Sequence, residues 1–170
     1  MSHIHVCSLA RVPDIVEKTG ARTLVTLINQ GTPVARPAAI APERHLFVAM
    51  SDIVTAMDGH ILPCDTHVDA LLTFVRQWDR VEPLLIHCFA GVSRSTAAAF
   101  ITACALSPAR SENDFAQAIR RLSPTATPNA RLVEVADSLL GREGRMITAI
   151  ERIGRGDDCF EGIPFALDLH

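Results

Sequence analysis

Residues 87–95 combine a nucleophile and a cation at a fixed spacing, reading His-Cys-Phe-Ala-Gly-Val-Ser-Arg-Ser. Five residues separate Cys88 from Arg94, and the apolar run Leu84–Ile86 comes directly before them. A turn from a buried strand into a helix leaves unpaired backbone N–H groups pointing at one spot, and the helix dipole adds partial positive charge there. Such a position stabilises a thiolate, and a guanidinium can bind two oxygens of a tetrahedral oxyanion. The pattern predicts phosphoryl transfer through a phosphocysteine.

The same spacing occurs a second time, between Cys104 and Arg110. No apolar strand precedes this second copy, no glycine allows its backbone to curl, and Pro108 removes an N–H group that an anion would need. The spacing alone is therefore weak evidence. The prediction at residues 87–95 depends on the strand, the glycine and the hydroxyls together.

At residues 87–95 the chain resembles the cysteine-dependent protein tyrosine phosphatase superfamily, and most closely its compact dual-specificity-like branch. The resemblance implies that Cys88 is the nucleophile and Arg94 the phosphate binder. It implies that His87 orders the loop and helps to keep the thiolate, and that the Ser95 hydroxyl eases departure of the thiolate from the phosphoenzyme. The residues that it implies for phosphate binding are Phe89, Ala90, Gly91, Val92, Ser93 and Arg94.

Strand and helix signals alternate along the first half of the chain, and the second half is helical. Apolar, β-branched runs predict strands at Ile4–Ser8, Thr23–Ile28, His45–Ala49 and Leu84–Ile86. Periodicity and end signals predict helices at Pro13–Thr19, Val68–Trp78 (capped by Asp65 or Thr66), Arg94–Leu106, Glu112–Leu122, Asn129–Leu140 and Gly144–Ile153. This order indicates an α/β fold with a short, mostly parallel sheet flanked by helices and a helical C-terminal half, as the resemblance also implies. We expect a single domain over residues 1–170, with a core at about 24–140 and a tail, 154–170, without a usable motif.

A phosphate ester needs a general acid to protonate its leaving oxygen, and three aspartates are candidates. Asp52 follows the strand His45–Ala49, so it should lie at the carboxyl edge of the sheet together with Cys88. Asp58 is farther along the same loop, and Asp65 begins the next helix. The resemblance also favours Asp52, although many relatives carry Trp-Pro before the acid and this chain has Met50-Ser51.

The segment Ser123–Asn129 resembles the Pro-Asn segment of dual-specificity-like phosphatases. The resemblance implies that Asn129 bonds to the phosphate loop and steadies it. Its position before a helix independently predicts an N-cap, and the two roles are compatible.

Composition places the chain in the ordinary globular class, with 170 residues, 48% hydrophobic and 21% charged. A net charge of −3 argues against nucleic-acid binding.

No apolar run approaches the roughly 20 residues that cross a membrane, and no signal peptide precedes the first strand. Five cysteines without paired spacing predict neither a disulfide framework nor a zinc site, and favour a reducing cytoplasm. His60 and His67 lie near Asp65, but their spacing does not indicate a metal site.

The loop interior lacks the lysines that relatives acting on inositol phosphates and phosphoinositides often carry there. The resemblance therefore implies a phosphoprotein or a small aryl phosphate as substrate. We expect no metal or organic cofactor, because the cradle and the guanidinium provide the charge stabilisation. Two alternatives stay open. One is a phosphate-binding module without turnover. The other is a different thiol enzyme, a sulfurtransferase or arsenate reductase, with Cys104 as the partner thiol.

Overall fold

The computed structural model describes residues 2–170 and contains one five-stranded sheet. The strands are β1 (His3–Cys7), β2 (Thr23–Ile28), β3 (His45–Ala49), β4 (Leu84–His87) and β5 (Phe165–Asp168). Their order in the sheet is β3-β2-β4-β1-β5. The first four strands pair in parallel, and β5 pairs antiparallel with β1. The predicted α/β fold with a mostly parallel sheet is confirmed.

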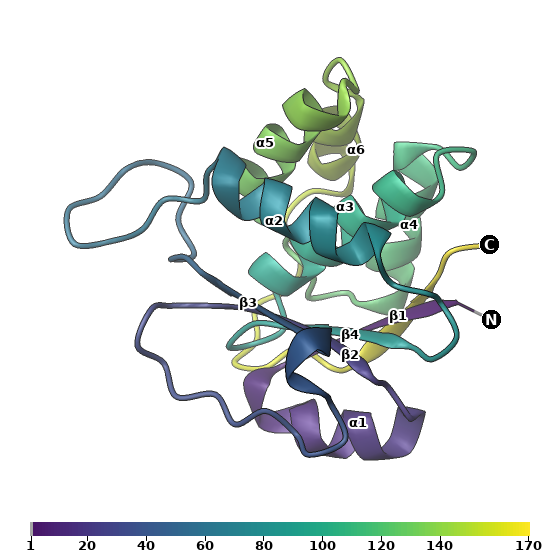
Figure 1. Cartoon of the computed structure of the whole chain (residues 1–170). Helices are drawn as coiled ribbons and strands as arrows, with labels where there is room; N and C mark the ends of the chain where they lie inside the picture. Colours follow the sequence, from purple (N-terminus) through teal and green to yellow (C-terminus); the bar gives the residue numbers. More distant parts are fainter. Residues whose placement is uncertain (1) are drawn as a thin grey trace.

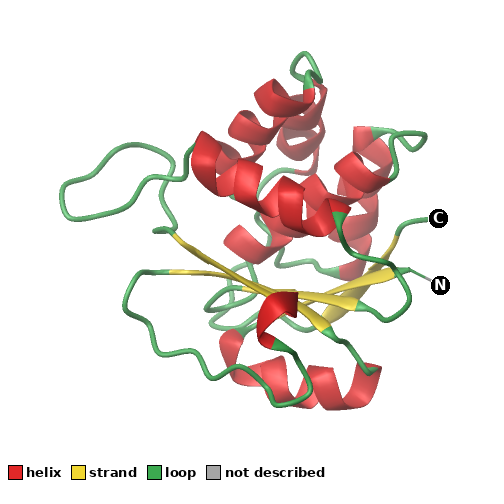
Figure 2. Ribbon diagram, viewed as in Figure 1, coloured by secondary structure: helices red, strands yellow, loops and turns green. Residues whose placement is uncertain are grey.

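Helices cover both faces of the sheet, unequally (Figures 1 and 2). One face packs against α1 (Val12–Thr19), which follows a 3₁₀ turn at Leu9–Arg11; a second 3₁₀ turn, Pro42–Arg44, leads into β3. The other face carries α2 (Asp65–Arg76), α3 (Arg94–Leu106), α4 (Glu112–Leu122), α5 (Ala130–Leu140) and α6 (Arg145–Ile153). Because both faces are covered, every residue of β2 is buried, as parallel strands usually are.

Helix α3 lies in the middle of the larger layer, and its first eleven residues, Arg94–Cys104, are all buried. Small residues such as Ala97, Ala98 and Ala99 let its backbone approach the sheet and the neighbouring helices closely. The helix that follows Cys88 is thus held rigidly on all sides.

The start of α2 differs from the prediction. The N-cap is Cys64 rather than Asp65 or Thr66. Its side chain accepts from the backbone of His67, and the His67 ring nitrogen Nδ1 accepts from the Cys64 N–H at 3.1 Å. This is a capping box built from a cysteine and a histidine, which are not the usual residues for it. Trp78 lies two residues beyond the end of the helix.

The tail forms the fifth strand, which the sequence did not predict. Phe165 and Leu167 are buried against the larger helical layer, whereas Ala166 and Asp168, which alternate with them, are only partly buried. This alternation is that of an edge strand. The sheet therefore extends well outside the expected core of residues 24–140.

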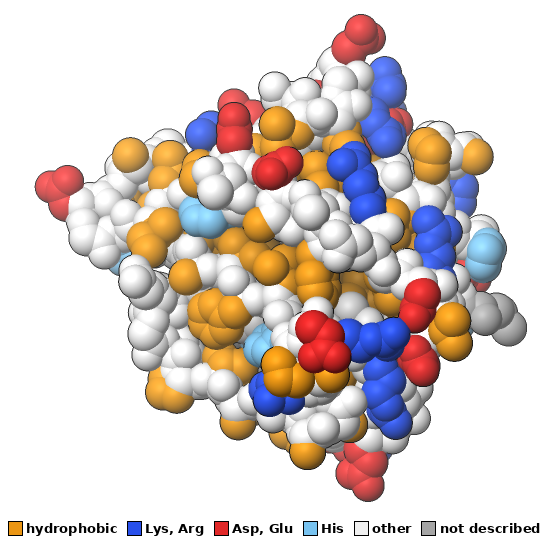
Figure 3. Space-filling view, in the orientation of Figure 1, with side chains coloured by type: hydrophobic (Ala, Val, Ile, Leu, Met, Phe, Trp, Pro, Cys, Tyr) orange, Lys and Arg blue, Asp and Glu red, His pale blue; other side chains and the backbone are white. Residues whose placement is uncertain are grey.

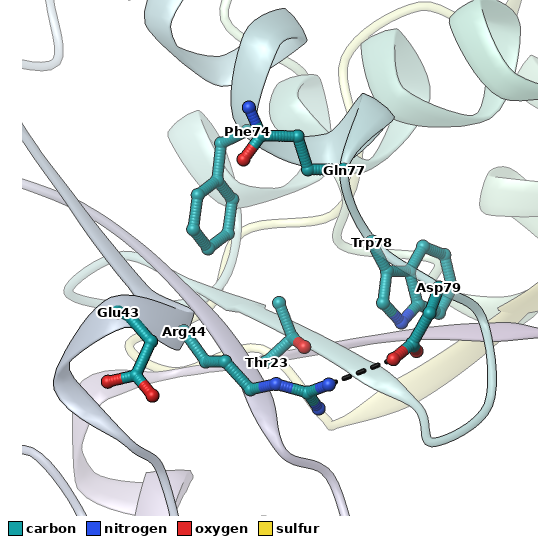
Figure 4. A pocket seen from close by; sticks show the side chains of 7 residues that line it. All are labelled: Thr23, Glu43, Arg44, Phe74, Gln77, Trp78 and Asp79. Atoms are coloured by element: carbon teal, nitrogen blue, oxygen red, sulfur yellow. Dashed lines mark hydrogen bonds and ion pairs between the residues drawn. The ribbon is translucent and has the colours of Figure 1, made fainter.

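Two long loops project from the carboxyl ends of β2 and β3, on the left of Figure 1. A small cavity of about 90 Å³ lies at the opposite edge, near the start of both strands (Figure 4). Its ion pair, Arg44 to Asp79 at 2.8 Å, spans the opening. This cavity is remote from the carboxyl edge, where α/β sites form. No helix within residues 2–170 is both long enough and apolar enough to cross a membrane.

Candidate active site

The Cys88 thiol lies immediately after β4, at the floor of the loop that connects β4 to α3. The residue is 2% exposed. Its Sγ is 3.0 Å from the Ser95 Oγ and accepts a hydrogen bond from the Gly91 N–H at 3.3 Å. The first turn of α3 thus brings a hydroxyl to the sulfur, and the loop aims a backbone amide at it.

Four carbonyls of this loop accept hydrogen bonds from other segments of the chain, which directs them away from the sulfur. The acceptor and donor pairs are Phe89 O with Leu9 N (3.0 Å), Ala90 O with Gly162 N (2.8 Å), Val92 O with Thr127 N (2.9 Å) and Ser93 O with Asn129 N (3.1 Å). In a trans peptide the N–H points opposite to the preceding carbonyl. Outward carbonyls therefore turn the N–H groups of Ala90, Gly91, Ser93 and Arg94 toward the centre of the loop, which forms the predicted anion cradle.

Gly91 is required at the closest approach of the loop to β1. Its φ is +74°, and a Cβ there would lie 2.8 Å from the Cys7 carbonyl carbon and from the Ser8 nitrogen. On its other side, a Cβ on Gly162 would lie 2.7 Å from the Gly91 oxygen. The loop is therefore held between β1 and the tail, with space only for glycine at two points.

Arg94 begins α3 and is only 6% exposed. Its Nη1 donates to the Asn29 Oδ1 at 2.5 Å and to the Met50 carbonyl at 2.9 Å. Its Nε is buried and has no partner among the described residues. A buried guanidinium donor without an acceptor is costly, and an oxyanion in the cradle would satisfy it. Sequence reasoning missed Asn29, whose signal was its place directly after β2, the strand beside β4.

His87 is fixed by a chain of hydrogen bonds that ends in a second histidine. Its Nδ1 donates to the Cys88 carbonyl at 2.9 Å, since a carbonyl can only accept. Its Nε2 therefore accepts from the Thr26 hydroxyl at 2.7 Å, and that hydroxyl accepts from the His45 Nε2 at 2.8 Å. Burial lowers the pKa of His87 to about 4, with His45 adding to the effect and the hydrogen bond to Cys88 opposing it. At neutral pH the ring is uncharged, so it can order the loop but carries no positive charge to hold a thiolate.

Asp52 is fastened to the rim of the loop through one oxygen. Its Oδ1 accepts from the Ser93 Oγ at 2.7 Å and from the Asn129 Nδ2 at 2.8 Å. Its Oδ2 makes no hydrogen bond to the described residues. One oxygen thus fixes the direction of the carboxyl group, and the other is free of hydrogen bonds to the described residues.

Asn129 caps a helix and also contacts the phosphate loop. Its Oδ1 accepts from the Leu132 N–H at 3.0 Å, which caps α5. Its backbone N–H bonds to the Ser93 carbonyl, and its Nδ2 bonds to Asp52 and to the Ile53 carbonyl. One residue thus ties a helix, the phosphate loop and the loop that carries Asp52.

Comparison with solved structures identifies this architecture. A phosphatase from Cydia pomonella, PTP-2, superposes with a TM-score of 0.62 at 20% sequence identity, covering 79% of this chain and 84% of that one. Human DUSP28 gives 0.61 at 18% identity, with 82% and 94% covered. PTPMT1 in complex with PI(5)P gives 0.61 at 13% identity, with 82% and 94% covered. The chain has the fold of the dual-specificity-like protein tyrosine phosphatases. No protein-family model and no curated protein sequence matches it.

Within this phosphatase fold, the other two candidate acids lie away from the cradle. Asp58 is exposed at the tip of its loop, and Asp65 is exposed at the start of α2. Neither makes a hydrogen bond to residues 87–95 in the described structure. Asp52 alone of the three contacts the phosphate loop.

Met50 and Ser51 directly precede Asp52, and their contacts anchor the loop that carries it. Met50 is fully buried, and its carbonyl accepts from Arg94. Ser51 pairs with Ile61 through its backbone N–H at 2.9 Å and its hydroxyl at 3.0 Å, which closes the intervening loop. The loop that carries Asp52 is thus fixed at both ends.

Cys104 is too far along α3 to act on Cys88. It follows Arg94 by ten residues, which is about 15 Å at the helical rise. Burial raises its pKa to about 12, with Glu112 adding to the effect. Its place supports a packing role. The cysteine beside the phosphate loop is Cys7, next to His87 in the sheet, and burial also raises its pKa to about 12.

His60 and His67 do not join Asp65 in a cluster. No group of three His, Cys, Asp or Glu side chains within residues 2–170 is arranged to hold a metal ion. The His67 ring is engaged in capping α2.

Proposed function

We propose that the chain is a phosphomonoester hydrolase of the protein tyrosine or dual-specificity type, working through a phosphocysteine on Cys88. The observation that carries the proposal is the cradle, in which inward amides surround a buried thiol and the Arg94 Nε lacks an acceptor. A phosphoryl group supplies the oxygens that these donors need.

In the first step, Cys88 attacks phosphorus as the thiolate, and the bond from phosphorus to the ester oxygen breaks. The loop amides and Arg94 hold the non-bridging oxygens. Asp52 gives the proton on its Oδ2 to the leaving oxygen, while Ser93 and Asn129 hold its other oxygen in place.

In the second step, water attacks phosphorus and gives a proton to the Asp52 carboxylate. The bond from phosphorus to sulfur breaks, and the electron pair stays on the Cys88 sulfur. The Ser95 hydroxyl, 3.0 Å away, stabilises this thiolate by donating to it. Inorganic phosphate leaves, and both groups return to their starting protonation states.

The deciding experiment is hydrolysis of p-nitrophenyl phosphate by the wild type and by Cys88→Ser in reducing buffer, across pH and with vanadate. Activity that needs Cys88 and is blocked by vanadate supports the phosphocysteine route. Vanadate binding without hydrolysis would indicate a binding module. Neither hydrolysis nor vanadate binding would refute the assignment of the loop.

A further inference from the structure

A mostly apolar groove of about 340 Å³ adjoins the outer side of the phosphate loop. Three segments line it: the turn after β1, the first half of the phosphate loop and the tail. Its main lining residues are Leu9, Ala10, Phe89, Ala90, Phe160 and Glu161. No sequence pattern pointed to this groove, because its walls come from opposite ends of the chain.

The groove is preformed, because hydrogen bonds fasten the three segments to one another. The Leu9 N–H donates to the Phe89 carbonyl, and the Gly162 N–H donates to the Ala90 carbonyl. The Ser8 hydroxyl donates to the Glu161 carboxylate. A ligand would therefore meet a shaped surface and would not have to order it.

Two phenylalanines of the groove are unusually exposed. Phe160 is fully exposed and Phe89 is 63% exposed. Single exposed apolar residues are ordinary, but a group of large ones around a groove marks an interaction site. A ligand that covers these exposed apolar side chains would therefore remove them from water, which favours binding.

The groove is continuous with the phosphate cradle. Phe89 and Ala90 directly follow Cys88, so their backbone belongs to the cradle while their side chains line the groove. A substrate with its phosphate in the cradle can therefore reach this surface with a neighbouring side chain.

The charge of the groove separates the possible ligands. Among the described residues that line it, Glu161 is the titratable one, and none has a cationic side chain. On the face in Figure 3, basic side chains gather mainly on the side of the termini, and the side of the long loops is mostly uncharged and apolar. A second phosphate or an anionic membrane surface would need cations here, whereas an apolar peptide side chain would not.

We propose that this groove binds an aromatic or large aliphatic side chain next to the phosphorylated residue of a protein substrate, with Phe160 as a specificity-determining residue. This inference rests on the proposed function and names its substrate class. The Glu161 carboxylate disfavours an acidic residue at the same position.

The test uses phosphotyrosine peptides that differ only in the two residues flanking the phosphotyrosine, which are Phe, Ala or Asp. The wild type should hydrolyse the Phe peptide with a kcat/KM roughly tenfold above that of the Ala peptide, and the Asp peptide least well. Phe160→Ala should abolish the Phe preference and leave p-nitrophenyl phosphate hydrolysis unchanged. The matched control is Phe47→Ala, because Phe47 is 44% exposed on β3 outside the groove; this variant should keep the preference.

An equal preference in the wild type and Phe160→Ala would overturn the inference, and so would faster phosphate release from phosphatidylcholine vesicles containing PI(5)P than from any peptide. Failure of the proposed function is separately visible as absence of Cys88-dependent p-nitrophenyl phosphate hydrolysis. In that case, fluorescence polarisation of labelled peptides on the wild type and Phe160→Ala still tests the groove. A lack of Phe-dependent binding would reject it.

Discussion

The two ends of α3 carry the same cysteine-to-arginine spacing in opposite environments. Cys88 and Cys104 are both buried, at 2% and 1% exposure. Cys88 faces loop amides and a hydroxyl, and the Arg94 Nε has no partner in the described structure. Arg110 instead donates to the carbonyls of Asp168 and His170 and lies 4.2 Å above the Phe115 ring. The difference teaches that an anion site needs free donors at a helix N-terminus, and that spacing alone does not create one.

The largest expected effect separates the two cysteines. Cys88→Ser should lower the hydrolysis rate at least about a thousandfold, because it removes the nucleophile. Cys104→Ser should retain the rate per folded molecule and lose roughly 1–3 kcal/mol of stability, because it buries a hydroxyl. The measurements are p-nitrophenyl phosphate turnover and urea unfolding. Equal losses of turnover in both variants would contradict the contrast between a catalytic Cys88 and a packing Cys104.

Substitutions of the two arginines should differ in their effect on catalysis nearly as much as those of the two cysteines. Arg94→Lys should lower kcat/KM by about 10²–10³, because a lysine cannot provide the forked donors that hold phosphate oxygens. Arg110→Lys should change stability alone. Steady-state kinetics with p-nitrophenyl phosphate and thermal unfolding distinguish the outcomes, and a fall of kcat/KM in Arg110→Lys would contradict the contrast.

Asp52→Asn should lower turnover of a poor leaving group such as phenyl phosphate by about 10² or more, because no proton reaches the leaving oxygen. The matched control is Asp58→Asn, which changes an exposed aspartate of the same loop and should be neutral. Vanadate affinity should stay nearly constant in both variants. Unchanged phenyl phosphate turnover in Asp52→Asn would refute its role as the acid.

Stability should fall on acidification because of His87. Its folded pKa, about 4, lies below the ordinary value of 6.5, so the unfolded chain binds the extra proton between these pH values. The contribution of His87 to the free energy of unfolding is complete above pH 6.5 and is lost as pH falls toward 4. Between pH 7 and pH 5 the loss is about 2 kcal/mol. Urea unfolding of the wild type and His87→Gln measures it. Parallel pH profiles in the two proteins would exclude His87 as the source.

The smallest expected effect concerns the tail. A Cβ at Gly162 would lie 2.7 Å from the Gly91 oxygen, and a Cβ at Gly156 would lie 2.5 Å from the Thr125 carbonyl carbon. Both alanine variants should lose stability, whereas vanadate affinity should fall, by roughly tenfold, only in Gly162→Ala, because only Gly162 touches the phosphate loop. Isothermal titration with vanadate distinguishes them, and equal affinities would show that the tail does not position the loop.

Much of this molecule could be predicted from local patterns. The strand Thr23–Ile28 and the helices that begin at Arg94 and Glu112 have the predicted bounds, because β-branched runs and capping residues act within a few positions. Asp52 and Asn129 lie where parallel topology and the Pro-Asn segment indicated. Their catalytic roles stay predictions.

The features that could not be predicted from the sequence depend on contacts between distant segments. Strand β5 has four residues and exists because β1 offers it a free edge, which no window around Phe165 reveals. Asn29 and Thr26 carry ordinary strand and loop signals, and only the packing of β2 beside β4 brings them to Arg94 and His87. Cys64 was not predicted as the N-cap of α2, because cysteine is an unusual residue at that position.

The bond from Gly162 to Ala90 has a consequence for biosynthesis. During translation, the segment containing Cys88 leaves the ribosome long before residues 156–168, which fasten the phosphate loop from outside and add β5 beside β1. The cradle is thus among the last parts of the molecule to be completed. A nascent chain or a prematurely terminated product would carry Cys88 without the finished loop around it. If the loop binds phosphate as proposed, phosphate affinity would report that translation had reached the fifth strand.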